Sequence, residues 1–220
     1  MRSFIIPSII ARNQKELNQR LKKVKFSKII HLDVMDGKFV RNKSLMFDFA
    51  LPFRFKIVNY EAHLMMKNPT NWIKKHYKKV DLIIVHYESR DIKKIIELIK
   101  KCKRKIGLAV NPGIPLTKLK NIPIREIDTL LIMTVYPGRY GSSFLPLMIK
   151  KIKQARKRYP KLNIEVDGSI NEKTIRKVFH TGANKFVVGS YLQNADDVKE
   201  RINELKRIIS YSERHKPFPK

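Results

Sequence analysis

Residues 28–37 read KIIHLDVMDG, an apolar run that contains a histidine and an aspartate and ends in a turn at Gly37. Such a run predicts a buried strand, and because side chains alternate along a strand, His31, Asp33 and Met35 share one face. An imidazole and a carboxylate on one face can together hold a metal ion. The stretch by itself fits equally a buried, hydrogen-bonded histidine beside a helix-capping aspartate, because short motifs often match by chance.

Similar apolar segments recur along the whole chain. The predicted strands cover residues 3–10, 28–35, 60–65, 82–87, 106–110, 129–135, 163–166 and 185–188. Apolar residues at helical spacing predict helices over 13–24, 68–78, 91–102, 146–159, 172–180 and 195–210, a helical turn at 115–119 and a poorly patterned short helix at 44–51. Continuous apolar strands that alternate with helices are typical of a parallel sheet with both faces covered.

Eight strand–helix units in a chain of 220 residues predict an α/β protein with a (β/α)8 fold, a TIM barrel. A doubly wound open sheet is the alternative, but it usually needs fewer strands and a glycine-rich first turn, which this chain lacks. No linker divides the sequence. We therefore expect one catalytic barrel domain over residues 1–212 and a C-terminal tail over residues 213–220.

The chain carries a formal net charge of +29, but its basic residues are distributed over nearly every predicted helix. A dedicated nucleic-acid surface would concentrate them, so we expect a dispersed positive surface with no specific nucleic-acid binding. The single cysteine, Cys102, excludes an intrachain disulfide and fits a reducing, cytoplasmic compartment. Pro7 interrupts the first residues too early for a signal peptide, and no apolar run is long enough to predict a membrane span.

Ligand-type side chains stand where three of the predicted strands end. They are His31, Asp33, His63 and Asp167. In a (β/α)8 barrel the C-terminal ends of the strands face the active site, so these side chains should converge. Two imidazoles and two carboxylates form a site for a divalent transition metal, although each residue alone fits a structural role equally well. The same level of the barrel holds Ser8, Met35, Met65, His86, Asn111, Met133, Gly168 and Gly189.

Two glycine–serine pairs follow the last two predicted strands: Gly168-Ser169 and Gly189-Ser190. Small residues before a helix allow backbone N–H groups to approach an anion, and the loops after strands seven and eight commonly hold phosphate in barrels. Each pair alone is also typical of a plain turn. Their occurrence in two successive loops predicts a phosphate site.

Several motifs, taken in order, resemble those of the ribulose-phosphate 3-epimerase family from Pro7 to about Leu192. They are Pro7-Ser8-Ile9, residues 31–37, His63-Leu64-Met65, Asn111-Pro112, Met133-Thr134-Val135 with Pro137-Gly138, residues 165–168, and Gly182-Ala183-Asn184 with Val188-Gly189-Ser190. The resemblance implies a divalent metal, a homo-oligomer, and conversion of D-ribulose 5-phosphate to D-xylulose 5-phosphate in the pentose phosphate pathway.

The resemblance also implies roles for single residues. His31, Asp33, His63 and Asp167 would bind one divalent cation per chain, and their donor atoms suit zinc, iron, manganese or cobalt. Asp33 would be the general base and Asp167 the general acid, with the roles exchanged in the reverse direction. The expected substrate contacts are Ser8, His63, Met35, Met65, Met133, Gly138, Gly141, Gly168, Ser169, Gly189 and Ser190.

Inversion of carbon 3 explains why these residue types are needed. A proton next to a carbonyl must be removed, and a metal can stabilise the resulting enediolate as a Lewis acid. Two carboxyl groups on opposite faces are required, one to take the proton and one to return it. Met35, Met65 and Met133 would surround the intermediate with soft, apolar side chains.

The chain departs from the family at two loops. Residues 136–142 read YPGRYGS where the family usually has Asn-Pro-Gly-Phe-Gly-Gly-Gln, so Tyr140 and Ser142 change the loop's phosphate contacts. Arg139 either supplies a compensating cation there or points to solvent. Arg41 stands where the family usually has proline, and the segment 47–58 is short, so either change can retune the substrate.

Two other functions remain as alternatives. Epimerases of six-carbon ketose phosphates, such as D-allulose 6-phosphate, resemble this chain about equally at the metal motifs. A nucleic-acid-binding protein built on a retained barrel is suggested by the charge of +29. That function has no need of an intact metal site, whereas all four candidate ligands are present here.

Overall fold

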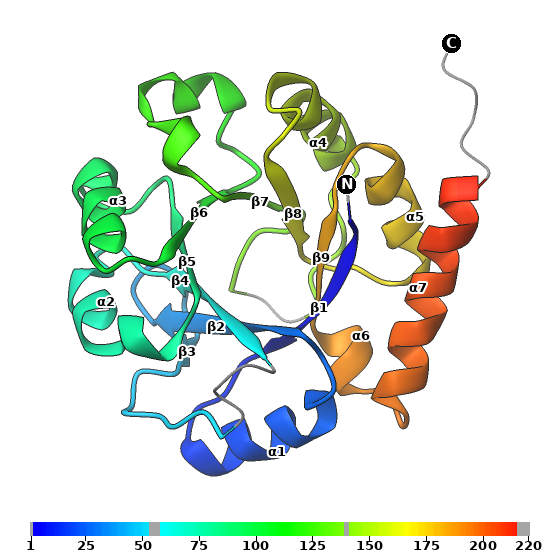
Figure 1. The fold of residues 1–220 in the computed structure, drawn as a ribbon, viewed down its shortest axis with the longest axis horizontal. Coiled ribbons are helices and arrows are strands. Elements are labelled where there is room, and N and C mark those ends of the chain that lie inside the picture. The colour runs from blue at the N-terminus through cyan, green and yellow to red at the C-terminus, as the bar shows by residue number, and fades with distance from the viewer. Residues whose placement is uncertain (1, 53–57, 139–140, 215–220) are drawn as a thin grey trace.

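A closed ring of parallel strands forms the centre of the molecule. The computed structural model describes residues 2–52, 58–138 and 141–214. The strands are β1 (Phe4–Ile9), β2 (Ile29–Asp36), β4 (Asn59–Met65), β5 (Leu82–His86), β6 (Lys105–Val110), β7 (Thr129–Met133), β8 (Asn163–Asp167) and β9 (Lys185–Val188). They follow the order β1-β9-β8-β7-β6-β5-β4-β2, and the pairing of β1 with β2 closes the ring (Figure 1). The predicted (β/α)8 barrel is thus confirmed.

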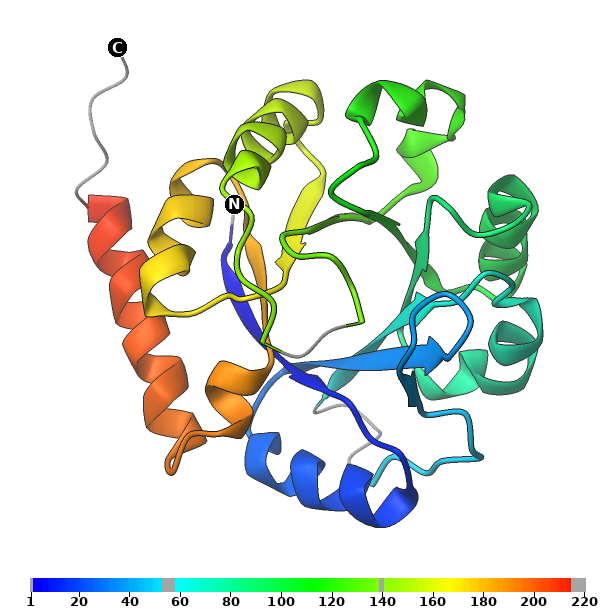
Figure 2. The same cartoon turned by 180° about the vertical axis from the view of Figure 1, so that it is seen from behind.

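Helices surround the ring on its outer side in both views (Figures 1 and 2). They are α1 (Gln14–Val24), α2 (Thr70–His76), α3 (Ile92–Lys101), α4 (Leu147–Arg158), α5 (Glu172–His180), α6 (Ser190–Gln193) and α7 (Val198–Arg214), with the 3-10 turns η1 (Tyr77–Lys79), η2 (Leu116–Asn121) and η3 (Ile124–Glu126). Each long helix buries an apolar stripe, as α3 does with Ile95, Ile96 and Ile99.

The opposite helix faces carry the positive charge. On α4, for example, Lys150, Lys153 and Lys157 are exposed while Ile152 and Ala155 are fully buried. This division keeps these three lysines in water, whereas Lys151 is buried and donates to the Asn111 carbonyl. Within the described part of the chain, no helix has the length and apolar character needed to cross a membrane.

The register of the strands brings the candidate site residues to one level. Asp33 on β2 pairs with His63 on β4, and Met133 on β7 pairs with Asp167 on β8. All these residues lie at or near the C-terminal ends of their strands. Since the strands are parallel, their C-terminal ends open to the same side of the barrel.

The barrel interior has an apolar and a polar half. The apolar half is formed by Leu82, Ile84, Ala109, Leu131, Met133 and Val135. The polar half contains the buried charged side chains of Glu61, Glu165 and Lys185 together with His31. Buried charges require partners, so this half is held by ion pairs rather than by dispersion alone.

Side-chain caps fix where two helices begin. The Asn13 side chain accepts a hydrogen bond from the backbone N–H of Glu16 at the start of α1. At α5, Asn171 and Thr174 form a reciprocal capping box. The second cap directly follows the Gly168-Ser169 loop, so it anchors one wall of the candidate site.

Residues 44–51 do not form the short helix that the sequence predicted. They contain only the end of β3 (Lys43–Ser44), which pairs antiparallel with β2, followed by irregular chain. Backbone groups here bond to distant segments, since the N–H of Leu45 donates to the carbonyl of Ala11 and the carbonyl of Leu45 accepts from the Trp72 indole. Tertiary contacts therefore override a weak helical pattern. Residues 53–57 of the short segment lie outside the described residues.

The end of the chain also differs from expectation. The helix predicted over 195–210 is present as α7, which begins later, where Asp197 accepts from the backbone N–H of Glu200, and the short α6 precedes it without having been predicted. Helix α7 continues to Arg214, two residues into the expected tail, and residues 215–220 lie outside the described residues. The domain boundary itself stays a prediction.

Candidate active site

Four ligand-type side chains meet at the C-terminal end of the barrel. One donor atom from each of His31, Asp33, His63 and Asp167 lies within 4.8 Å of the others. The Nδ1 atom of His63 is 3.2 Å from Asp33 Oδ1 and 3.6 Å from Asp167 Oδ2. The Nε2 atom of His31 is 3.4 Å from the same Asp33 oxygen. The structure thus brings together all four residues that the strand-end argument singled out.

The two carboxyl groups differ in their affinity for a proton. Burial favours the neutral form of Asp33, but hydrogen bonds with His31 and His63 outweigh it and hold the pKa of Asp33 well below its usual range. At Asp167, burial and the nearby charge of Asp33 raise the pKa to about 8. Environments that separate two pKa values in this way are typical of an acid–base pair. Without a bound cation, these opposite pKa shifts favour an ionised Asp33 and a protonated Asp167.

The two histidines are also held in different states. Burial, together with the charges of His86 and His31, lowers the pKa of His63 to about 4 despite a hydrogen bond with Asp33. His63 is therefore a neutral imidazole at neutral pH, which is the form that binds metals. Burial acts in the same direction on His31, but the carboxylates of Asp33, Glu165 and Glu61 outweigh it and raise its pKa well above the usual value.

Two glutamates and a lysine form a buried cluster of ion pairs with His31. The His31 Nδ1 atom is 2.8 Å from Glu61 Oε1. The Lys185 ammonium is 2.7 Å from Glu61 Oε2 and 2.5 Å from Glu165 Oε2. Although burial disfavours its charged form, Glu165 and Glu61 raise the pKa of Lys185 above its usual value. The group formed by His31, Glu61 and Glu165 also has the composition of a cation site, but Lys185 already supplies its positive charge.

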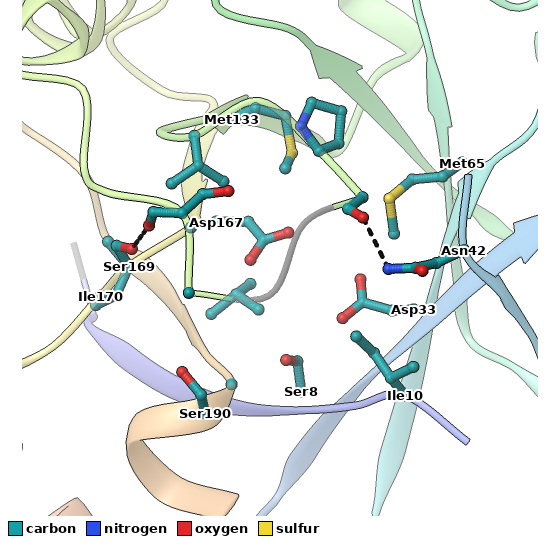
Figure 3. A pocket seen from close by; sticks show the side chains of 18 of the residues that line it. Ser8, Ile10, Asp33, Asn42, Met65, Met133, Asp167, Ser169, Ile170 and Ser190 are labelled. Carbon is teal, nitrogen blue, oxygen red and sulfur yellow. Dashed lines mark hydrogen bonds between the residues drawn. The ribbon is translucent and has the colours of Figure 1, made fainter. Parts of the chain in front are cut away.

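A pocket opens directly above Asp33 and Asp167 (Figure 3). Its apolar wall includes Met35, Met65 and Met133, whose exposed fractions are only 1%, 4% and 3%. The predicted contacts on its lining are Ser8, Met35, Met65, Met133, Gly138, Gly141, Gly168, Ser169, Gly189 and Ser190. His63, which was also expected to contact substrate, is fully buried and does not line this pocket, because its ring lies beneath the carboxyl groups.

Glycines shape the polar wall of the pocket. Gly168 has a φ of +120°, and a Cβ atom there would lie 2.5 Å from Val135 Cγ2. A Cβ atom on Gly189 would lie 2.9 Å from the Ser8 hydroxyl. The neighbouring Ser169 hydroxyl donates to the backbone carbonyl of Ser142. Both Gly-Ser pairs therefore border the pocket as predicted; at Gly168 a side chain would clash with Val135, and at Gly189 the Ser8 hydroxyl would have to move.

The chain after β7 lines the pocket at Gly138 and Gly141. The Asn42 side chain donates a 2.7 Å hydrogen bond to the Gly138 carbonyl, so the chain after β2 is tied to the chain after β7. This contact is drawn as a dashed line in Figure 3. Arg139 and Tyr140, which follow Gly138, lie outside the described residues. Arg41 is exposed and lines a second hollow beside the pocket.

Sequence reasoning overlooked several residues that the structure places around the site. Glu61 and Glu165 stand two positions before His63 and Asp167, so strand alternation alone directs them to the same face. Asn42 gave no comparable signal, because its contact joins two loops. His86 was recognised as a strand-end residue but was not assigned a role, and its partner His63 lies on the neighbouring strand β4.

Comparison with known proteins gives a consistent result. The sequence profile described as the ribulose-phosphate 3 epimerase family matches residues 4–193. A ribulose-phosphate 3-epimerase from Schizosaccharomyces pombe is 32% identical, with 97% of each chain covered. Enzymes of the same name from Chlamydia pneumoniae and Bacillus subtilis are 37% and 32% identical; the matches cover 87% and 92% of this chain and 88% and 97% of theirs.

Solved structures with much lower sequence identity share the fold. A 3-hexulose-6-phosphate synthase from Salmonella typhimurium superposes with a TM-score of 0.67 at 13% identity, covering 94% of this chain and 99% of its own. A tryptophan synthase complex from Pyrococcus furiosus contains a chain that superposes with a TM-score of 0.68 at 18% identity, covering 94% and 100%. These likenesses extend to the barrel alone.

Proposed function

This chain belongs to the ribulose-phosphate 3-epimerase family, and from that membership we propose that Asp33 and Asp167 invert carbon 3 of D-ribulose 5-phosphate. The observation that carries the proposal is their pairing in one pocket, in surroundings that lower the pKa of Asp33 and raise that of Asp167. They enter the pocket from β2 and β8, which are separated in the ring by β1 and β9. The two carboxyl groups can therefore approach a planar enediolate from opposite faces.

Each carboxyl group has one proton to move. In the forward direction the ionised Asp33 takes the proton from carbon 3, and the protonated Asp167 delivers a proton to the opposite face. The reaction leaves Asp33 protonated and Asp167 ionised, which is the state needed for the reverse reaction. In the metal-free protein the raised pKa of Asp167, about 8, favours the protonated form, which is the form that can donate.

The four ligand-type residues fit a divalent cation. The buried Nε2 atom of His31 has no hydrogen-bond partner among the described residues, and it faces Asp33. Two imidazoles and two carboxylates suit zinc, iron, manganese or cobalt, and we propose one such ion per chain, held by His31, Asp33, His63 and Asp167. When bound there, the ion withdraws electron density from the carbonyl next to carbon 3 and so acidifies the proton of that carbon.

The walls of the pocket suit the remaining parts of a sugar phosphate. The three buried methionines keep water away from carbon 3, which strengthens electrostatic interactions at the carboxyl groups. The Gly168-Ser169 and Gly189-Ser190 pairs line the same pocket and leave backbone surface open to the phosphate group. Ser8 lies between the two walls, as Figure 3 shows, and we propose that it contacts the sugar.

A coupled assay with two substrates tests this function. Metal-loaded protein should convert D-ribulose 5-phosphate to D-xylulose 5-phosphate and should act much more slowly on D-allulose 6-phosphate. The three relatives described above carry the pentose name, which supports this order. Faster turnover of the six-carbon substrate would reassign the specificity, and turnover of neither would overturn the proposal.

Two further properties belong to this proposal. We expect the enzyme to be a homo-oligomer, which light scattering of the purified protein measures. We also expect it to act in the cytoplasm, since its single cysteine fits a reducing compartment.

A further inference from the structure

Two buried imidazoles touch beneath the pocket. The Nε2 atom of His63 lies 2.8 Å from the Nε2 atom of His86, and both side chains are fully buried. Their ring planes are inclined by only 22°, with the centroids 4.9 Å apart. A nitrogen–nitrogen contact of this length is a hydrogen bond, so one nitrogen carries the proton and the other offers its lone pair.

The direction of this hydrogen bond decides whether His63 can bind a metal. Its Nδ1 atom faces Asp33 and Asp167, so Nδ1 is the nitrogen that serves as a ligand. A ligating nitrogen carries no proton, and in a neutral imidazole the proton then sits on the other nitrogen. His63 must therefore donate from Nε2, and His86 must accept on its own Nε2 and carry its proton on Nδ1.

A competing arrangement exists. If His86 donates from Nε2, the proton of His63 moves to Nδ1, where Asp33 Oδ1 accepts it at 3.2 Å. This second arrangement satisfies His63 without a metal and blocks the ligand position. Cation binding therefore places the proton of His86 on Nδ1, and a group that stabilises a proton there favours binding against the pull of Asp33 on His63.

Glu88 is placed to do this. Its Oε2 atom is 3.8 Å from His86 Nδ1, and both atoms are buried without a hydrogen-bond partner among the described residues. A carboxylate beside Nδ1 attracts a proton on that nitrogen and repels a bare lone pair. The Phe39 ring packs on the His86 ring with centroids 4.6 Å apart, which restricts how His86 can turn away.

His31 offers an internal comparison for this logic. Its Nδ1 atom is 2.8 Å from the Glu61 carboxylate, so Nδ1 keeps its proton, and Nε2, which faces Asp33, is the nitrogen that would give up its proton and bind a cation. The two histidines thus present different nitrogens to the site, and each has a carboxylate behind it. For His31 the carboxylate is in direct contact, whereas for His63 the effect passes through one further imidazole.

We infer that Glu88 is a positioning residue that acts through His86 to hold His63 in the tautomer whose Nδ1 lone pair faces Asp33 and Asp167. This inference rests on the proposed function, because it takes His63 as a metal ligand. Carboxylates behind ligand histidines typically contribute about 10- to 100-fold to metal affinity. Glu88 lines the second hollow and its side chain is 26% exposed, so it can be replaced without opening a cavity in the core.

The test compares zinc affinity and histidine tautomers in Glu88 variants. Glu88→Gln should weaken zinc binding about 10- to 100-fold in a chelator competition, and Glu88→Asp, which keeps the charge, should recover part of the loss. Nitrogen-15 NMR of the metal-free protein should show the His63 population moving from the Nε2–H to the Nδ1–H form in Glu88→Gln. Glu97→Gln is the matched control, because Glu97 is exposed on α3 and its removal changes the net charge equally.

The outcomes separate this inference from the proposed function. If wild-type protein binds zinc tightly but Glu88→Gln matches Glu97→Gln in both affinity and tautomer, the role of Glu88 is refuted. If the affinity falls without any change in tautomer, Glu88 acts by charge alone and the relay through His86 is refuted. If His63→Ala binds zinc as tightly as the wild type, the proposed ligand set is refuted. This measurement involves no Glu88 variant, so it tests the ligand set independently of the role of Glu88.

Discussion

Lys185→Met removes the ammonium group that lies between Glu61 and Glu165. The two carboxylates are only 2% and 0% exposed and lie 2.7 Å and 2.5 Å from the ammonium nitrogen. Breaking a buried ion pair by removing one partner typically costs about 3–5 kcal/mol, because the remaining charge is left unpaired in the interior. Methionine has nearly the same length, so little of this loss comes from packing. We expect the free energy of unfolding to fall by about 3–5 kcal/mol.

The loss should depend on pH with a definite sign. In the wild type, the pKa of Glu61 is lowered to about 2 by Lys185 and His31, which outweigh the effect of burial. Its contribution to stability is thus complete above the unfolded pKa, near 4.5, and is lost as the pH falls toward 2. Without Lys185, only His31 opposes the effect of burial, so the pKa of Glu61 rises and protonation then favours the folded variant. The difference between the two proteins should therefore shrink as the pH falls from neutral toward about 5.

Urea unfolding at neutral pH and at about pH 5 measures this prediction, with a chelator present so that metal binding does not contribute. Lys105→Met is the matched control, because Lys105 begins β6, is exposed and forms no ion pair with another described residue. A loss no larger than that of the control, or a loss that does not change with pH, would refute the idea that Lys185 neutralises the polar half of the barrel.

Two further predictions concern the site. His63→Ala should reduce bound metal well below about one equivalent per chain, as elemental analysis measures, while the exposed His180→Ala keeps the full amount; equal contents would remove His63 from the site. Gly168→Ala should destabilise the fold by about 1–3 kcal/mol and raise KM, because φ is +120° and the new Cβ would lie 2.5 Å from Val135. Gly113→Ala, with open space around its Cβ, should be neutral, and equal effects of the two substitutions would exclude the steric explanation.

Periodicity and alternation were sufficient to predict the barrel and the convergence of its strand-end residues. The apolar run at β2 fixes which of its side chains face the interior, and the same rule applies to β4 and β8. Residues 44–51 escaped prediction because their conformation depends on hydrogen bonds to Ala11 and Trp72, which are distant in sequence. Local propensity carries no information about such contacts.

The residues behind the site were harder to predict than those lining it. Nothing in the sequence distinguishes Lys185 from other lysines at the start of a strand. Only closure of the ring brings it to Glu61, which is 124 residues away in the sequence. The His63–His86 contact likewise depends on the register between β4 and β5. Sequence patterns gave the direction of each side chain, whereas these partners required the three-dimensional arrangement.

The fate of the carbon 3 proton in heavy water tests the division of work between Asp33 and Asp167 most directly. Starting from D-ribulose 5-phosphate, Asp167→Asn should still exchange that proton with solvent through Asp33 but should not form D-xylulose 5-phosphate. Asp33→Asn should lose both exchange and inversion, by about 10²- to 10⁴-fold. Metal content is measured in each variant, because both residues are also proposed ligands. A fully metal-loaded Asp33→Asn protein that epimerises at nearly the wild-type rate would contradict the account.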